Sequence, residues 1–127
     1  MSIRPETYGL AFDKRHSYLC VTVKAAAIDR ACVLDYLAEI ADKCAESRTR
    51  NVIIERDIPA VLSDAEMRDT WGVFLDMDPR MHIAIINTHS AAAVALKRLI
   101  AAARERNADA EYFEDLASAE RWIAQSR

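Results

Sequence analysis

Hydrophobic and polar positions change their period along the chain, and each period predicts an element. Residues 8–14 alternate weakly between apolar and polar side chains, and residues 18–24 (YLCVTVK) are rich in β-branched and aromatic side chains. Both patterns are typical of β-strands. The polar segment 14–17 between them predicts a turn, so we expect an antiparallel hairpin whose first strand lies at the edge of a sheet.

The rest of the chain alternates between helical and strand-like segments. Apolar residues recur at intervals of three and four in four segments, which predicts helices at about 30–47, 63–78, 90–106 and 115–125. Short apolar runs between them predict buried strands at 51–57, 82–88 and 110–114. The expected N-caps of the helices are Asp29, Ser63, Ser90 and Asp115. Pro79 is expected to end the second helix, and Asn107 to adopt a left-handed conformation after the third.

This order of elements predicts an α/β fold. Strands that are separated by helices pair in parallel through right-handed crossovers. We therefore expect the order β-β-α-β-α-β-α-β-α, with a mostly parallel five-stranded sheet covered by four helices. A length of 127 residues fits a single domain spanning 1–127, with residues 1–6 flexible. Only two glycines and three prolines are present, which argues against an all-β fold rich in tight turns.

The charge balance excludes some classes of partner. Twenty acidic and 17 basic residues give a net charge of −3, which does not provide the basic surface of a nucleic-acid-binding protein. No apolar run reaches the length of about 18 residues that a transmembrane helix needs. The first six residues lack the apolar stretch of a secretory leader, so we expect a cytoplasmic protein. Three cysteines without a CxxC spacing are expected to be reduced and buried.

Several segments, taken in order, resemble the STAS-like group, specifically its SpoIIAA-like branch. The matching pieces are YLCVTV at 18–23, IIERD at 53–57, LSDAE at 62–66, HIAII at 82–86, YFED at 112–115 and AERWI at 119–123. The resemblance implies a small domain that binds a partner protein. It also implies a switch by phosphorylation of a serine at the start of the second helix, where Ser63 stands alone without the second serine and glycine of the family pattern. The branch is similar in outline to lipid-carrying CRAL-TRIO domains, which implies an apolar ligand pocket.

The second helix carries the largest apolar side chains at helical spacing. This stripe contains Met67, Trp71, Phe74 and Leu75, with Met77 nearby. It is either core or one wall of a ligand pocket or partner groove, for which Ile58 and Leu62 in the preceding loop would form the lip. The predicted binding residues are Ile58, Leu62, Met67, Trp71, Phe74 and Met77. Among these we expect Trp71 to contribute most and to remain reachable from outside. Gly72 suggests a close approach or flexing in mid-helix.

Ser63 has both a structural and a regulatory interpretation. The spacing of Ser63 and Glu66 matches a capping box, in which each side chain bonds the backbone N–H of the other residue. A phosphate on Ser63 would meet the positive end of the helix dipole, but Asp64 and Glu66 would oppose its charge.

Glu55 and Asp57 form the alternative site, since they end a predicted parallel strand and point to the same face. A general acid–base pair would suit a small enzyme, although no nucleophile or nucleotide-binding loop accompanies it. His82 and His89 lie too far apart along the chain to share a metal ion, so we expect no metal and no cofactor.

The sequence therefore favours a non-catalytic, cytoplasmic, STAS-like domain with a regulatory role. It would bind a protein partner or a small lipid-like molecule through the second helix and its preceding loop. The alternatives are a small enzyme that uses Glu55 or Asp57, and a homodimer formed through the aromatic stripe.

Overall fold

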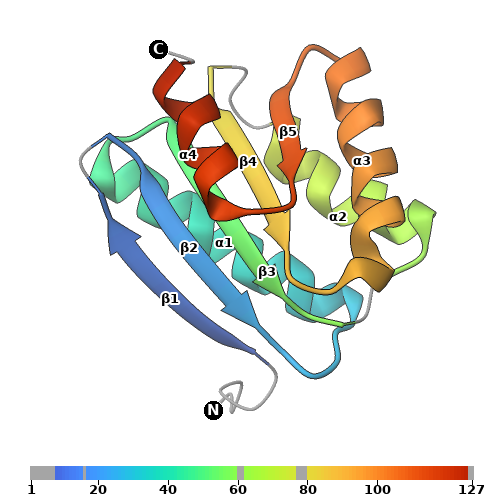
Figure 1. Ribbon diagram of the computed structural model, residues 1–127. Helices are drawn as coiled ribbons and strands as arrows, with labels where there is room; N and C mark the ends of the chain where they lie inside the picture. Colours follow the sequence, from blue (N-terminus) through green and yellow to red (C-terminus); the bar gives the residue numbers. More distant parts are fainter. Residues whose placement is uncertain (1–7, 16, 60–61, 77–79, 126–127) are drawn as a thin grey trace.

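A five-stranded sheet organises the molecule, for which a computed structural model describes residues 8–15, 17–59, 62–76 and 80–125. The strands are β1 (Gly9–Lys14), β2 (Leu19–Lys24), β3 (Asn51–Asp57), β4 (His82–Asn87) and β5 (Asp109–Phe113). They lie side by side in the order of the sequence, with β1 antiparallel to β2 and all other neighbours parallel (Figure 1). The predicted α/β class, the element order and the edge position of β1 are confirmed. The sheet is mixed because of the first hairpin.

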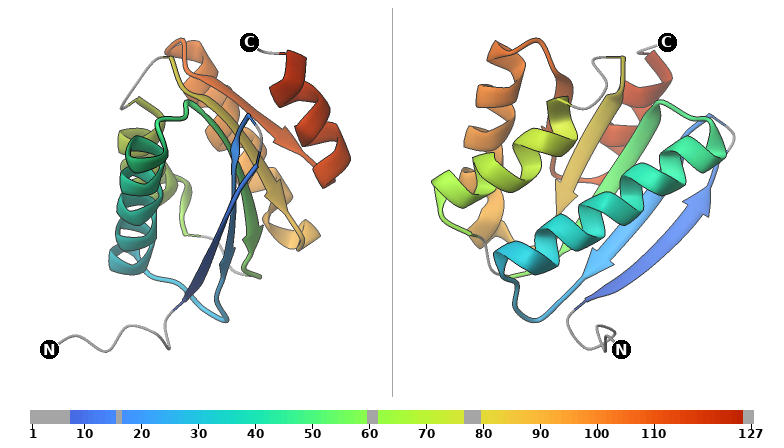
Figure 2. Two further views of the ribbon diagram at one scale, coloured as in Figure 1. Left: turned by 90° about the vertical axis from the view of Figure 1, so that its left-hand side faces the viewer. Right: turned by 180° about the vertical axis from the view of Figure 1, so that it is seen from behind.

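Four helices cover the sheet unequally. They are α1 (Arg30–Ser47), α2 (Asp64–Asp76), α3 (Ala93–Glu105) and α4 (Leu116–Gln125). From β2 to β5, each strand lies next to the previous one and the sheet grows in one direction. Right-handed crossovers between these parallel strands therefore place α1, α2 and α3 on the same face of the sheet. The last helix, α4, follows β5 and packs on the opposite face (Figure 2). Within the described ranges, no helix combines the length and apolarity that crossing a membrane requires.

Two apolar cores lie on the two faces of the sheet. The alternation of β3 divides them, because Val52 and Ile54 point toward α1–α3 whereas Ile53 points toward α4. The larger core includes α2, which lies between α1 and α3. The smaller core consists of Cys20, Ile53, Ala84, Ile86, Ala119 and Ile123, with Trp122 and Leu116 packed against it. The sheet is therefore covered on both faces at β3 and β4, as the continuous apolar runs predicted.

Two of the helix starts follow the sequence prediction closely. Asp29 accepts a hydrogen bond of 2.8 Å from the backbone N–H of Cys32, and Asp115 accepts one of 2.7 Å from Ser118. The prediction for Ser90 was wrong. The chain leaving β4 first forms a 3₁₀ turn at Ser90–Ala92, so α3 begins at Ala93 without a side-chain cap. The N-cap position of α3 is occupied by Ala92, two residues after Ser90.

Left-handed backbone occurs without glycine. Asn107 has a φ of 71°, as predicted, and Arg48 has a φ of 56°. Arg48 ends α1, where its N–H donates to the carbonyl of Ala45 and the N–H of Thr49 donates to that of Cys44. The predicted flexibility of residues 1–6 and the predicted end of α2 at Asp78 and Pro79 concern positions outside the described residues.

Candidate functional site

Trp71 lies in the interior of the protein. Its side chain is 0% exposed and meets the rings of Tyr36 and Phe74 edge-on, at centroid distances of 6.3 and 6.2 Å. The prediction that this indole remains reachable from outside was therefore wrong. The physical reason is topological: because α2 is flanked by α1 and α3 on the same face, its apolar stripe packs onto the sheet and its neighbours.

The other predicted binding residues have different positions. Ile58 is fully buried in the larger core, and Leu62 is half-buried against it. Met77 lies outside the described residues. Met67 and Phe74 are 2% and 4% exposed, yet each lines a hollow at the surface, on α2. The structure therefore places two of the six predicted residues at the borders of cavities.

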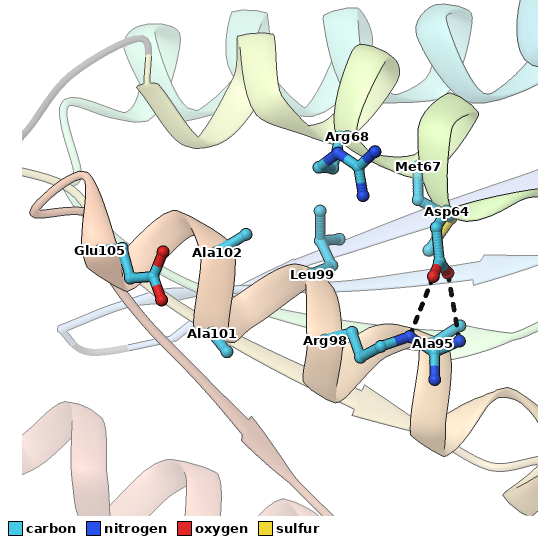
Figure 3. Close-up of a pocket in the computed structure, with 9 residues that line it drawn as sticks. All are labelled: Asp64, Met67, Arg68, Ala95, Arg98, Leu99, Ala101, Ala102 and Glu105. Carbon is cyan, nitrogen blue, oxygen red and sulfur yellow. Dashed lines mark hydrogen bonds and ion pairs between the residues drawn. The ribbon is translucent and has the colours of Figure 1, made fainter.

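A groove between α2 and α3, which we call the α2–α3 groove, has a volume of about 270 Å³ (Figure 3). It is lined by Asp64, Met67 and Arg68 of α2 and by Ala95, Arg98, Leu99, Ala101, Ala102 and Glu105 of α3. Met67, Leu99 and Ala95 are buried and form an apolar floor, whereas the charged residues are exposed. The groove can therefore receive an apolar group beneath charged walls.

One end of the α2–α3 groove is closed by a two-point ion pair. Arg98 donates from Nε to Oδ2 of Asp64 at 3.0 Å and from Nη2 to Oδ1 at 3.2 Å (Figure 3). Exposed pairs of this kind contribute about 0–1 kcal/mol to stability. Their planar geometry nevertheless fixes how the two helices face each other. Arg68 and Glu105 extend from opposite walls.

Ser63 caps α2 as predicted. Its Oγ accepts a hydrogen bond of 3.2 Å from the backbone N–H of Glu66 and donates one of 3.3 Å to the Glu66 carboxylate. The Glu66 carboxylate thus meets the serine hydroxyl, where a full capping box would have it reach the Ser63 backbone N–H. The hydroxyl is exposed, and its phosphorylation stays a prediction, with Asp64 and Glu66 as neighbouring negative charges.

Glu55 and Asp57 share one face of β3, as predicted. Asp57, however, is hydrogen-bonded to Thr88 and His89. Its Oδ1 accepts a hydrogen bond of 3.1 Å from the Thr88 hydroxyl and lies 2.8 Å from His89 Nε2. The hydrogen bond from His89, followed by that from Thr88, holds the pKa of Asp57 below its ordinary value. Asp57 is therefore a carboxylate at neutral pH and poorly suited to act as a general acid.

The sequence interpretation missed a buried polar network at the same edge of the sheet. Arg56 is fully buried, and its Nη1 donates to the carbonyl of Ile58 at 3.0 Å and to Oδ1 of Asn87 at 3.1 Å. Asn87 in turn donates from Nδ2 to the carbonyl of His89. Burial lowers the pKa of Arg56, although Tyr36 beside it acts in the opposite direction. The network ties together the segments that follow β3 and β4.

A signal for this network was present in the sequence. Arg56 continues the every-second-residue pattern of Val52 and Ile54, whose side chains face the larger core. That parity predicts an inward-facing arginine. The sequence interpretation of this strand instead considered only its two carboxylates, Glu55 and Asp57.

In the described part of the chain, no three His, Cys, Asp or Glu side chains gather in a way that could hold a metal ion. The cysteines Cys20, Cys32 and Cys44 are free and buried, as predicted. In comparisons with known proteins, no family model matches the chain and no curated protein matches it significantly in sequence, so the STAS-like assignment stays a prediction.

Proposed function

We propose that the chain is a non-catalytic binding domain that holds a partner protein in the α2–α3 groove. The observation that carries this proposal is the groove itself, in which the nearly buried side chains of Met67 and Leu99 form an apolar floor between Arg68 on one helix and Glu105 on the other. An apolar centre within a charged rim is the usual anatomy of a protein interface.

The size of the groove is compatible with one anchoring side chain of a protein partner. Its volume of about 270 Å³ is slightly below the range of about 300–1,000 Å³ that is common for small-molecule pockets. Such a hollow suits one large apolar side chain that anchors a partner. Arg68 and Arg98 line the rim of this groove, where they can contact polar groups of the partner.

The surface beside the groove supports the same occupant. Val94 is one of two large apolar side chains that are strongly exposed among the described residues. It precedes Arg98 by four residues, so both lie on the same face of α3. An amphipathic helix of the partner, with apolar residues facing Leu99 and Val94 and a basic residue facing Glu105, would match this surface.

The STAS-like identity and the cytoplasmic location belong to this proposal. The order of strands and helices and the single helix on the opposite face support a SpoIIAA-like architecture. The regulatory role of Ser63 belongs to it too, because Ser63 directly precedes Asp64, the groove residue at which α2 begins.

The test is a comparative capture experiment from an extract of the source cells. Ala102→Trp places an indole in the groove, whereas Ala124→Trp places one at an exposed position of α4. We expect the wild type and Ala124→Trp to enrich the same protein, measured by quantitative mass spectrometry, and Ala102→Trp to lose it.

Circular dichroism and the thermal midpoint of each variant serve as the folding control. The proposal is wrong if Ala102→Trp remains folded and every protein enriched by the wild type is enriched by that variant to the same extent. A Glu105→Lys variant provides a second test in the same capture experiment. Reversing this rim charge should reduce the amount of captured protein without filling the groove.

A further inference from the structure

The first strand, β1, leaves one edge of the sheet open. It pairs with β2 without interruption over Gly9–Lys14, and among the described residues no further strand or helix lies beyond it (Figure 1). Edge strands are usually protected by a proline, a bulge or charged side chains, because their outward backbone groups attract other strands. β1 contains no proline and no bulge, and its two charged residues, Asp13 and Lys14, lie together at one end. The rest of this edge is therefore suited to pair with another strand.

The hairpin hydrogen bonds show which backbone groups of β1 face outward. The N–H of Arg15 donates to the carbonyl of Tyr18 at 2.8 Å, and the register of the two strands places these residues opposite each other. In an antiparallel ladder, such hydrogen-bonded pairs alternate with pairs that exchange no hydrogen bond. Every second residue of β1 therefore directs its N–H and C=O away from β2, namely Leu10, Phe12 and Lys14.

The side chains along this edge are apolar on one face. Leu10 and Phe12 are half-buried against the larger core, with Tyr8 beside them. Nζ of Lys43 on α1 lies 5.8 Å from the centre of the Phe12 ring. On the opposite face of β1, Ala11 is exposed and small. An added strand would therefore meet apolar side chains on one face and no bulky side chain at Ala11 on the other.

We propose that β1 pairs in an antiparallel manner with β1 of a second copy of this chain, with Ala11 on the two-fold axis. Leu10 of one copy then lies opposite Phe12 of the other, and the two exchange hydrogen bonds through their outward backbone groups. Asp13 lies opposite Gly9, so no like charges oppose each other across the new pair of strands. The two sheets become one continuous sheet.

The charges at the two ends of β1 match those of a second copy. In this register, Lys14 of one copy lies beside Tyr8 of the other. The Tyr8 hydroxyl donates a hydrogen bond to Glu39 of α1, so a basic side chain approaches an acidic one at each end of the pair. A register shifted by two residues, with Phe12 on the axis, would place the Asp13 side chains of the two copies diagonally across from each other. The charges therefore favour the first register.

This interface is separate from the α2–α3 groove, and neither proposal depends on the other. It also differs from the homodimer considered from the sequence, because the aromatic stripe of α2 is buried in the core. A contact between two strands buries little surface, so we expect a transient dimer whose fraction rises with protein concentration.

Charge-swapped variants of the axis residue test the proposal with the full-length protein. In Ala11→Lys and in Ala11→Glu, two like charges meet across the axis, which opposes pairing. We expect each variant alone to have a dimer Kd raised about fivefold, measured by sedimentation equilibrium. An equimolar mixture of the two should form a heterodimer at least as tight as the wild-type dimer, because opposite charges then meet.

Two kinds of control accompany this experiment. Ala124→Lys and Ala124→Glu carry the same charges at an exposed position of α4 and should dimerise as the wild type does. Ala102→Trp, which fills the α2–α3 groove, should also leave the dimer intact, so failure of the groove proposal can be distinguished from failure of this one. Circular dichroism verifies that every variant is folded.

Amide exchange measured by NMR adds a residue-specific test. The N–H groups of Leu10 and Phe12 face outward, so they should exchange more slowly at high protein concentration than at low concentration. The N–H groups of Ala11 and Asp13 bond β2 within each copy, so their exchange should depend much less on concentration.

Other outcomes would overturn the proposal. A wild type that remains monomeric up to about 1 mM does not form this dimer. If Ala11→Lys and Ala11→Glu each associate as the wild type does, or do not combine with each other, any dimer forms through another surface. If the outward N–H groups are protected only in the complex with the captured protein, the edge binds a strand of that protein and not a second copy.

Discussion

Arg56 and Asn87 occupy paired positions on β3 and β4, and Nη1 of the buried guanidinium donates a hydrogen bond of 3.1 Å to Oδ1 of the amide. Replacing Asn87 with alanine removes that acceptor and also the donor that serves the carbonyl of His89. We expect Asn87→Ala to lower the free energy of unfolding by about 2 kcal/mol, since hydrogen bonds to buried charged groups contribute about 1.5–3 kcal/mol. Urea denaturation measures the change.

The neighbouring residue provides the control for this experiment. Thr88 is exposed, and its hydroxyl bonds Asp57 at the surface. Thr88→Ala should therefore cost clearly less than Asn87→Ala. If the two variants lower the free energy of unfolding equally, the buried network contributes no more to stability than the surface hydrogen bond.

Trp71 should behave as a core residue. Its side chain is 0% exposed between Tyr36 and Phe74, so truncation leaves a large cavity. We expect Trp71→Ala to destabilise the protein by about 3–5 kcal/mol, measured by denaturant unfolding. Val73→Ala, at a position 65% exposed on the same helix, should change stability by less than about 0.5 kcal/mol. A Trp71→Ala protein as stable as the wild type would contradict this assignment.

Gly72 is not required by a close contact. A methyl group added at Gly72 would have Arg106 Nη2 as its nearest neighbour outside the adjoining helix backbone, at 3.7 Å, an ordinary van der Waals distance. The interpretation that glycine here permits a close approach was therefore wrong. Because alanine is favoured over glycine in a helix interior by about 1 kcal/mol, Gly72→Ala should stabilise the protein by a similar amount. A lower thermal midpoint for the variant would show that flexibility at this position matters.

Asp57 should contribute to the acid sensitivity of the fold. Hydrogen bonds from His89 and Thr88 lower its pKa in the folded state. The stabilising contribution is therefore fully present above the pKa of the unfolded chain, about 3.9, and is lost as the pH falls through the lower folded value. The difference in unfolding free energy between wild type and Asp57→Asn should be constant above about pH 5 and should shrink as the pH falls from there toward about pH 2.

A graded variant strengthens the acid experiment. Thr88→Ala removes one of the two hydrogen bonds to Asp57 and should give a pH dependence between those of wild type and Asp57→Asn. If wild type and Asp57→Asn differ by a constant amount at every pH, the ionisation of Asp57 is not linked to folding.

Local patterns were sufficient to predict the α/β class and the order of strands and helices. Asp29 and Asp115 cap their helices because a capping aspartate acts within three residues, a distance that sequence alone specifies. Ser90 was misassigned because a 3₁₀ turn and an α-helix begin with similar residues, and only the geometry after β4 separates them. The alternation of side chains along β3 also predicts that Arg56 faces the larger core, as Val52 and Ile54 do. The sequence interpretation did not use this signal.

The candidate site was less predictable because it depends on packing between helices. Met67 and Trp71 belong to the same apolar stripe in the sequence, yet Met67 borders the α2–α3 groove and Trp71 is sealed in the core. Which of them reaches the surface is decided by the position of α3. Likewise, Asp57 and His89 are 32 positions apart and meet only because β3 and β4 are neighbours in the sheet.

Amide hydrogen exchange tests the central claim most directly, once the partner has been captured. Exchange of the free protein is compared with that of the complex, residue by residue. A partner in the α2–α3 groove predicts slower exchange in residues 64–68 and 94–105 and no change in α4. Slower exchange at Asp57 and His89, or in α4, with α2 and α3 unaffected, would contradict the account.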